Sequence, residues 1–203
     1  MLNTGITVFC LRRPSEPALR QWLIGQSGQP FCYASVGASR EALAPRGWFV
    51  NQARVRLGAG AATYQRARKA LANWRMIPAW VGARAAGESI ELGSIYALSA
   101  RYLGVWTVNA CRVVYVIDEP GEIDRFGFGA GTLHGHAMSG EERFLVTWDH
   151  GDDSVWYEVW SFSRPRHWLA WAAVWLIRRL QQRFAVDSAA AMLQAATGGK
   201  MTR

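Results

Sequence analysis

The stretch from Gly140 to Ser163, GEERFLVTWDHGDDSVWYEVWSFS, decides the fold. Apolar and polar residues alternate on both sides of its centre, as they do in half-buried β-strands. Residues 150–153 (HGDD) separate the two runs and have the composition of a turn. The stretch therefore predicts an antiparallel hairpin with strands at 140–149 and 154–163.

The faces of this hairpin follow from its register. A four-residue turn pairs the strands outward from the turn, and the expected pairs are Trp148–Val155, Val146–Tyr157 and Phe144–Val159. These six side chains share one face, which is apolar enough to be a core face. The opposite face holds Arg143, Leu145, Thr147, Trp156, Glu158 and Trp160. Because that face carries two tryptophans, we expect residues 1–45 to cover it, and we expect Arg143 to lie near Glu158.

The sequence on either side of the hairpin extends the same pattern. Periodicity and the positions of glycine and proline predict a short strand at 6–11, a helix at 17–24 and a helix at 61–74. Further strands are expected at 49–57, 79–86, 88–99, 105–119 and 125–133. Pro165 is expected to open a long C-terminal helix that reaches about Ala195. We divide the chain into an N-terminal extension (1–45), a domain (46–197) and a disordered tail (198–203).

Two different stripes run along the expected C-terminal helix. One is apolar and suits packing against a sheet: Leu169, Ala173, Leu176, Ile177, Leu180 and Phe184. The other contains Trp168, Trp171 and Trp175 and continues into arginines. The second stripe predicts either another packing surface or a contact with a membrane surface or a partner protein.

This order of elements predicts an α+β protein with a helix-grip fold, in which a curved antiparallel sheet of about seven strands surrounds a long C-terminal helix. The order resembles the START-like (Bet v 1-like) superfamily, and that resemblance implies a cavity between sheet and helix. Several phrases also resemble an uncharacterised protein family of bacteria and plants, UPF family 0548. They are FCYASVGAS (31–39), VRLGAGAATYQRARKALANW (55–74), CRVVYVIDEP (111–120), GTLHGHAMSGEERF (131–144) and SFSRP (161–165). The chain departs from the family's phrase at His134, where proline is expected.

Composition excludes several classes of function. The formal net charge is +8, but the basic residues are dispersed and only Lys69 and Lys200 are lysines, so no nucleic-acid-binding stripe or module is present. The longest apolar run, 168–177, is too short to cross a bilayer. Cys10, Cys32 and Cys111 are widely spaced and predict reduced thiols. The N-terminus lacks a signal-peptide pattern, so we expect a cytoplasmic protein. The sequence does not determine an oligomeric state.

The expected cavity has a candidate polar group. Glu142 shares its strand face with Phe144 and Val146, so its carboxyl should point into the cavity, where burial would raise its pKa. We predict that a small apolar or amphipathic ligand binds there, without a cofactor. The expected ligand-binding residues are Tyr115, Glu142, Phe144, Val146, Trp148, Tyr157, Leu169, Ala173 and Leu176.

Three alternatives remain open. The first is an enzyme of the same fold, a cyclase or hydrolase, with Glu142 or Tyr115 as acid or base. The second is a cupin-like metal enzyme, because His134, His136 and Glu141 carry part of a metal-binding pattern. The incompleteness of that pattern favours no metal, and we instead expect His136 to fix its turn through a hydrogen bond. The third is an interaction module acting through Trp168, Trp171 and Trp175.

Overall fold

The computed structural model describes residues 9–87, 89–102, 104–166 and 168–198, with Leu169 described by its backbone alone. The helices are α1 (Glu16–Gly25), α2 (Gly60–Ala72), α3 (Trp168–Ala172) and α4 (Val174–Thr197), with a 3-10 turn η1 (Ala38–Glu41). The strands are β1 (Phe9–Cys10), β2 (Phe49–Ala59), β3 (Val81–Ala85), β4 (Ile95–Tyr102), β5 (Val105–Glu119), β6 (Ile123–Thr132), β7 (Met138–Asp149) and β8 (Ser154–Pro165). Residues 199–203, most of the predicted disordered tail (198–203), lie outside the described residues.

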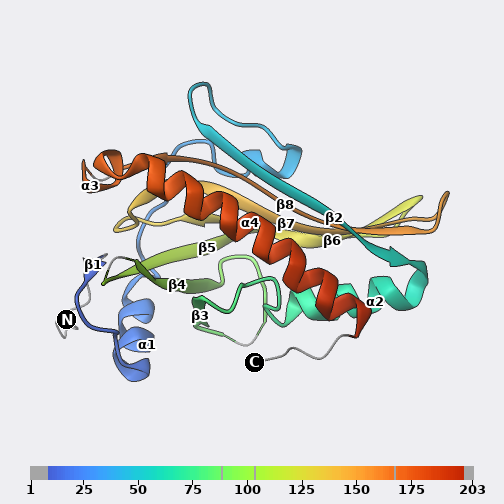
Figure 1. The fold of residues 1–203 in the computed structure, drawn as a ribbon, viewed down its shortest axis with the longest axis horizontal. Helices are drawn as coiled ribbons and strands as arrows, with labels where there is room; N and C mark the ends of the chain where they lie inside the picture. Colours follow the sequence, from blue (N-terminus) through green and yellow to red (C-terminus); the bar gives the residue numbers. More distant parts are fainter. Residues whose placement is uncertain (1–8, 88, 103, 167, 199–203) are drawn as a thin grey trace.

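The strands form one antiparallel sheet in the order β2-β8-β7-β6-β5-β4-β3, with β1 paired to the first residues of β5. Strands β3 to β8 are a simple meander, and β2 joins the far edge beside β8. The helix α4 crosses this curved sheet diagonally, and α2 lies against the same face near the C-terminal end of α4 (Figure 1). The α+β helix-grip fold expected from the sequence is confirmed.

The register of the β7–β8 hairpin is the one expected. Trp148 pairs with Val155, and the pairs Val146–Tyr157 and Phe144–Val159 follow. The turn closes through Asp149 and Asp152, whose carboxylates accept the backbone N–H groups of Gly151 and Ser154. A polar side chain that bonds two residues ahead stabilises this kind of turn. The hairpin therefore sets which side chains face α4.

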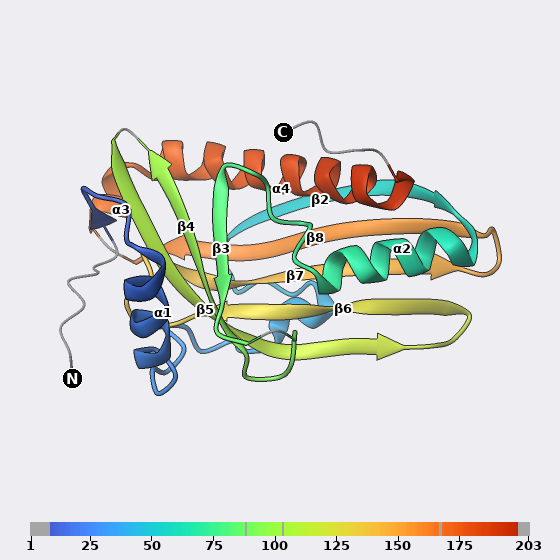
Figure 2. The ribbon, with the colours of Figure 1, turned by 90° about the horizontal axis from the view of Figure 1, so that it is seen from below.

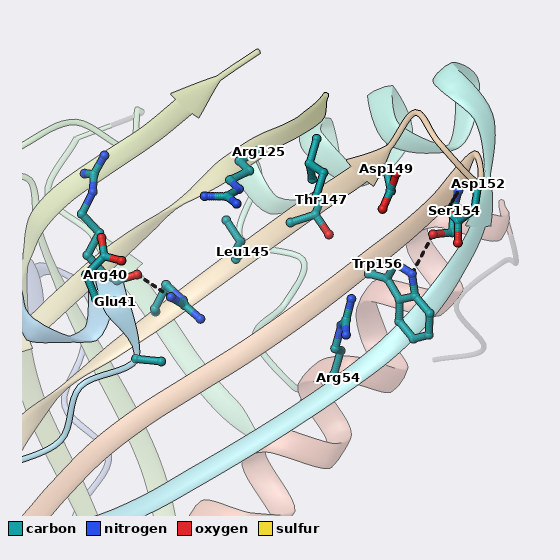
Figure 3. Close-up of a pocket in the computed structure, with 13 residues that line it drawn as sticks. Arg40, Glu41, Arg54, Arg125, Leu145, Thr147, Asp149, Asp152, Ser154 and Trp156 are labelled. Carbon is teal, nitrogen blue, oxygen red and sulfur yellow. Dashed lines mark hydrogen bonds between the residues drawn. The ribbon is translucent and has the colours of Figure 1, made fainter. Parts of the chain in front are cut away.

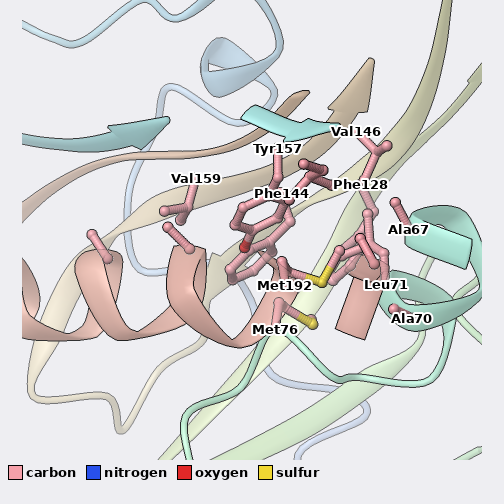
Figure 4. Packing of buried hydrophobic residues seen from close by; sticks show 14 of the residues in the cluster. Ala67, Ala70, Leu71, Met76, Phe128, Phe144, Val146, Tyr157, Val159 and Met192 are labelled. Atoms are coloured by element: carbon pink, nitrogen blue, oxygen red, sulfur yellow. The ribbon is translucent and has the colours of Figure 1, made fainter. Parts of the chain in front are cut away.

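The inner face of the sheet holds the main core. It joins α2, α4 and the central strands around the fully buried side chains of Phe144, Val146, Tyr157, Leu71 and Met192 (Figure 4). The Tyr157 hydroxyl, which would be costly to bury alone, shares a 2.7 Å hydrogen bond with the Ser188 hydroxyl of α4. That bond fixes the rotation of α4 against the sheet.

The outer face of the sheet is covered by two N-terminal pieces. Leu19 and Leu23 of α1 pack on the β4–β5 end, and residues 31–48 lie over β7 and β8. Trp160 is buried beneath Tyr33 and its neighbours, whereas Trp156 is half-exposed under the Arg54 guanidinium. The division of the chain at residue 45 stays a prediction.

The largest differences from the expected elements are at three places. Strand β4 begins at Ile95 rather than at residue 88, because a turn at 92–94 precedes it. Pro165 does not open the helix; it ends β8, opposite Met138. The expected single C-terminal helix is broken at Ala173, which leaves helical geometry with φ −105° and ψ 20°. A proline is tolerated at the end of a strand, where its missing N–H removes little ladder bonding.

Candidate functional site

A pocket of about 750 Å³ opens between the sheet and α4. Its walls are mostly apolar: Leu98, Ala100, Val105, Ala130, Met138, Phe162, Ala170, Ala173, Leu176, Ile177, Leu180 and Phe184. Polar groups from the strands line one part of it, among them Asn109, Cys111, Glu142, Ser161 and Ser163. The volume is within the range of sites that bind small molecules and cofactors.

Glu142 is the distinctive polar group of this pocket. Strand pairing places it between Ala130 of β6 and Ser161 of β8 on the inner face. Its carboxylate is partly buried among the pocket walls, and no described residue donates a hydrogen bond to it or pairs with it. Burial alone raises the pKa of Glu142 to about 8. Burying a carboxyl group without a partner in an apolar pocket destabilises the folded state. Glu142 is therefore a candidate for a role in function.

His136, Cys111 and the tyrosines with shifted pKa values around the pocket are neutral at physiological pH. Burial lowers the pKa of His136 to about 3, so its imidazole carries no charge. Burial raises the pKa of Tyr102 to about 12. It also raises the pKa values of Cys111 and Tyr96, to which the nearby Glu142 charge adds. Glu142 is thus the group whose protonation changes near pH 7 to 8.

The structure brings three of the nine predicted ligand residues into the pocket: Glu142, Ala173 and Leu176. Phe144, Val146 and Tyr157 are on the predicted face but fully buried in the core, and Trp148 packs on Tyr64 at the edge of that core. Leu169 belongs to α3, and its side chain lies outside the described part of the structure. Phe144, Val146 and Tyr157 do not line the pocket, because α2 and the C-terminal half of α4 cover that end of the sheet.

Tyr115 requires a correction, because it lies on the outer face. A bulge between Val113 and Tyr115 in the β5–β6 pairing shifts the alternation by one residue. Val113 therefore faces the core, while the Tyr115 hydroxyl shares a 2.6 Å hydrogen bond with Ser39 on the opposite side. The ring lies over Gly129, where a Cβ would meet it at 2.2 Å. Tyr115 cannot act with Glu142 in the pocket.

The structure does not bring the three alternative metal ligands together. His134 is exposed and its Nδ1 lies 3.4 Å from Arg166. His136 accepts a 2.9 Å hydrogen bond at Nδ1 from the Met138 N–H, which confirms that it fixes the turn through the backbone. Glu141 points to the outer face. Within the described ranges, no group of three histidine, cysteine, aspartate or glutamate side chains has metal-binding geometry.

Glu141 is instead the centre of a polar cluster that holds residues 33–39 on the sheet. Its carboxylate accepts hydrogen bonds from the Tyr33 hydroxyl (2.5 Å), the Gly37 N–H (2.8 Å), and the N–H (2.9 Å) and hydroxyl (2.5 Å) of Ser39. The Tyr33 ring lies above Gly131, where a Cβ would meet its hydroxyl at 2.0 Å. This cluster was not predicted from the sequence, and neither were the pocket residues Asn109 and Cys111. His136 and Glu141 were predicted only as alternative metal ligands, and His136 also as a residue that fixes its turn.

A second, polar pocket of about 530 Å³ lies on the outer face between η1 and strands β2, β6, β7 and β8 (Figure 3). It holds Arg40, Arg54, Arg125 and Arg143, but also Glu41, Asp149 and Asp152. Arg143 is paired with Glu158, as expected, and also donates to the Arg40 carbonyl oxygen. Mixed charges and internal pairing make it a weaker candidate for a ligand site than the pocket beneath α4.

The tryptophans of the C-terminal helices form an exposed surface. Trp168, Trp171 and Trp175 are 71%, 57% and 63% exposed. Figures 1 and 2 both place α3 and β1 at the same end of the sheet, where Leu11, Ala170 and Ala173 line the pocket. No helix in the described part of the chain is long and apolar enough to cross a membrane.

Comparison with known proteins places this fold in a family. The sequence pattern of a domain of unknown function, DUF1990, matches residues 32–191. A UPF0548 protein of Dictyostelium discoideum is 29% identical over 97% of this chain and 99% of its own length, and one of Arabidopsis thaliana is 35% identical over 73% of each. Among solved structures, a point mutant of norcoclaurine synthase from Thalictrum flavum, in complex with a transition state analogue, covers 77% of this chain and 98% of its own with a TM-score of 0.50 and 11% identity. At that identity the likeness concerns the fold alone, which is the helix grip described above. The chain belongs to the UPF0548 family and contains the domain of unknown function DUF1990.

Proposed function

We propose that this protein binds a small amphipathic molecule in the pocket beneath α4. The ligand's apolar part packs against Leu176, Ile177 and Leu180, and its polar end reaches Glu142. The observation that carries the proposal is a pocket of about 750 Å³ with mainly apolar walls and one unpaired carboxyl. Apolar walls with a few oriented polar groups are the usual composition of small-molecule sites.

The position of Tyr115 favours binding over catalysis. An acid–base reaction commonly needs two groups that approach the substrate together. Tyr115, predicted as the alternative acid or base to Glu142, is on the other side of the sheet. His136 lines the pocket, but its Nδ1 already accepts the Met138 N–H and its pKa is about 3.

Blocking the pocket tests this proposal. The change Leu180→Trp adds volume inside the pocket and is expected to weaken binding of 1-decanol, a neutral amphipathic probe, by about tenfold or more. Val186→Trp is the matched control, because Val186 is on the same helix and 62% exposed, and it should leave binding unchanged. Isothermal titration calorimetry measures both, and native mass spectrometry shows whether a ligand is retained from the host. Equal binding by wild type and Leu180→Trp would contradict the proposal.

A second proposed activity is contact with an anionic membrane surface through Trp168, Trp171 and Trp175. The observation in its favour is the charge around these tryptophans: residues 159–186 contain five arginines and no carboxylate. Arg178 lies over the Phe49 ring, and Arg164 over Trp48, rather than in ion pairs with described carboxylates. Tryptophan beside arginine is typical of protein segments that lie in the headgroup region.

The prediction for this surface is salt-sensitive binding to vesicles. Wild-type protein is expected to cosediment with vesicles that contain phosphatidylserine and not with pure phosphatidylcholine vesicles. The double change Trp171→Ala/Trp175→Ala should weaken that binding by about tenfold, whereas Val186→Ala should not. Cosedimentation that is equal for the double variant and wild type would assign the tryptophans to a protein partner or to no contact.

A further inference from the structure

Charged side chains in the pocket wall are of one sign. The chain has 23 lysines and arginines, yet none of them lines the pocket in the part of the chain that the structure describes. The acidic residues that do are Glu141 and Glu142. Glu141 has its carboxylate occupied by Tyr33, Gly37 and Ser39 on the outer face, so Glu142 alone offers a charge to a ligand.

Within the described ranges of the chain, no basic side chain pairs with Glu142. The side chains that face it from the neighbouring strands are Ala130 and Ser161, and those of Tyr96, Cys111 and Tyr157 are near enough for its charge to affect them. From α4 the pocket receives Leu176, Ile177, Leu180, Gln181 and Phe184. The Gln181 amide is already used, because it donates to the Ser163 hydroxyl at 2.8 Å. A carboxylate placed this way gains most from a cation that arrives with the ligand.

Aromatic rings in the same wall suit a cationic head as well. Tyr96 and Tyr102 line the pocket from the β3–β4 side, whereas the nearby Trp80 ring already lies under the Arg183 guanidinium, 5.0 Å from its centroid. An ammonium group near such rings is attracted by the electron density of their faces, whereas a carboxylate or phosphate is repelled. An anionic head beside Glu142 would meet a like charge, and none of the described residues that line the pocket is basic.

Resting on the proposed function, we infer that the ligand class is lipophilic amines, with the protonated amine paired to the Glu142 carboxylate and the hydrocarbon part beneath α4. A neutral alcohol of the same shape enters the pocket but leaves the carboxylate unpaired. A fatty carboxylate is excluded by charge. Amine binding requires the ionised form of Glu142, so it releases a proton wherever the free protein holds one there.

Three probes of equal chain length test the inference: decylamine, 1-decanol and decanoate, each titrated by calorimetry at about pH 8.5, where Glu142 is largely ionised and the amine is protonated. Decylamine is expected to bind at least about tenfold more tightly than 1-decanol, and decanoate most weakly. Glu142→Gln should remove the preference for the amine, so that decylamine and 1-decanol bind the variant with equal affinity. Glu142→Asp, which keeps the charge, should retain the preference, and Glu122→Gln, an exposed residue at the β5–β6 turn, should behave as wild type.

The outcomes separate this inference from the function on which it rests. Binding of 1-decanol as tight as that of decylamine would overturn the amine class and leave the pocket function standing, as would tightest binding by decanoate. Failure of all three probes to bind would overturn both. A further readout is pH: decylamine affinity should rise by up to about tenfold per unit as pH approaches 8 and then level off, because Cys111, the tyrosines and His136 do not titrate in that window. A flat profile would contradict the role of Glu142.

Discussion

Replacing Glu141 by alanine is expected to lower the free energy of unfolding by about 4 kcal/mol. The change removes the acceptor of four hydrogen bonds and leaves the Tyr33 hydroxyl and two backbone N–H groups without a partner beneath residues 33–39. Chemical denaturation followed by tryptophan fluorescence measures the loss, since Trp160 is buried under this segment.

The control is an ion pair of the same segment that is open to solvent. Glu119 pairs with Arg40, and both side chains are more than two-fifths exposed. Exposed pairs contribute little, so Glu119→Ala should cost less than about 1 kcal/mol. A loss of similar size in both variants would show that the buried hydrogen bonds of Glu141 do not hold the segment.

The stability of the protein should fall as pH rises through neutrality, and Glu142 should be the cause. Its pKa is about 8 in the folded state and near 4.5 in the unfolded state, so between these pH values the folded state binds more protons than the unfolded state. The free energy of unfolding therefore falls as pH rises through this range. Between about pH 6.5 and pH 8 the expected loss is about 2 kcal/mol, at about 1.4 kcal/mol per unit. Urea denaturation across this range measures it.

His136 does not contribute to the loss of stability between pH 6.5 and pH 8. The pKa of His136 is lowered to about 3, so the unfolded chain takes up its proton first, and stability falls as pH drops below 6.5. Above pH 6.5 that contribution is constant. In Glu142→Gln the decline between pH 6.5 and 8 should disappear, and a decline of unchanged slope in that variant would assign it to another group.

The sequence predicted the hairpin and the orientation of Glu142 for one reason. A strand buried on one face must alternate with period two, and the short β7–β8 turn fixes the register, so the faces of Phe144, Val146 and Tyr157 follow from counting. The same counting placed Glu142 toward α4. The helix stripe from Ala173 to Phe184 was also identified correctly, because its period of 3.6 residues persists for several turns.

Counting failed wherever the spacing was irregular. One extra residue between Val113 and Tyr115 reverses the alternation, and nothing in the run RVVYVID distinguishes a bulge from regular strand. Asn109, Cys111 and Tyr96 were missed because the pairing of β4 with β5 depends on tertiary packing. Which part of the sheet stays open depends on how far α2 and α4 extend over it, so the core residue Phe144 was taken for a ligand contact.

Strand β7 places two neighbouring glutamates on opposite sides of one sheet, and this arrangement separates two kinds of selection. Substitutions at Glu141 would be sorted by how much folded protein a cell accumulates, because that carboxylate serves the structure. Selection on substitutions at Glu142 would act through ligand binding, because that carboxylate contacts no other part of the described chain. Two adjacent codons would thus respond to independent pressures. Insertion or deletion of a single residue between Glu142 and the β7–β8 turn, which sets the register, would exchange the faces of the two glutamates and disable both.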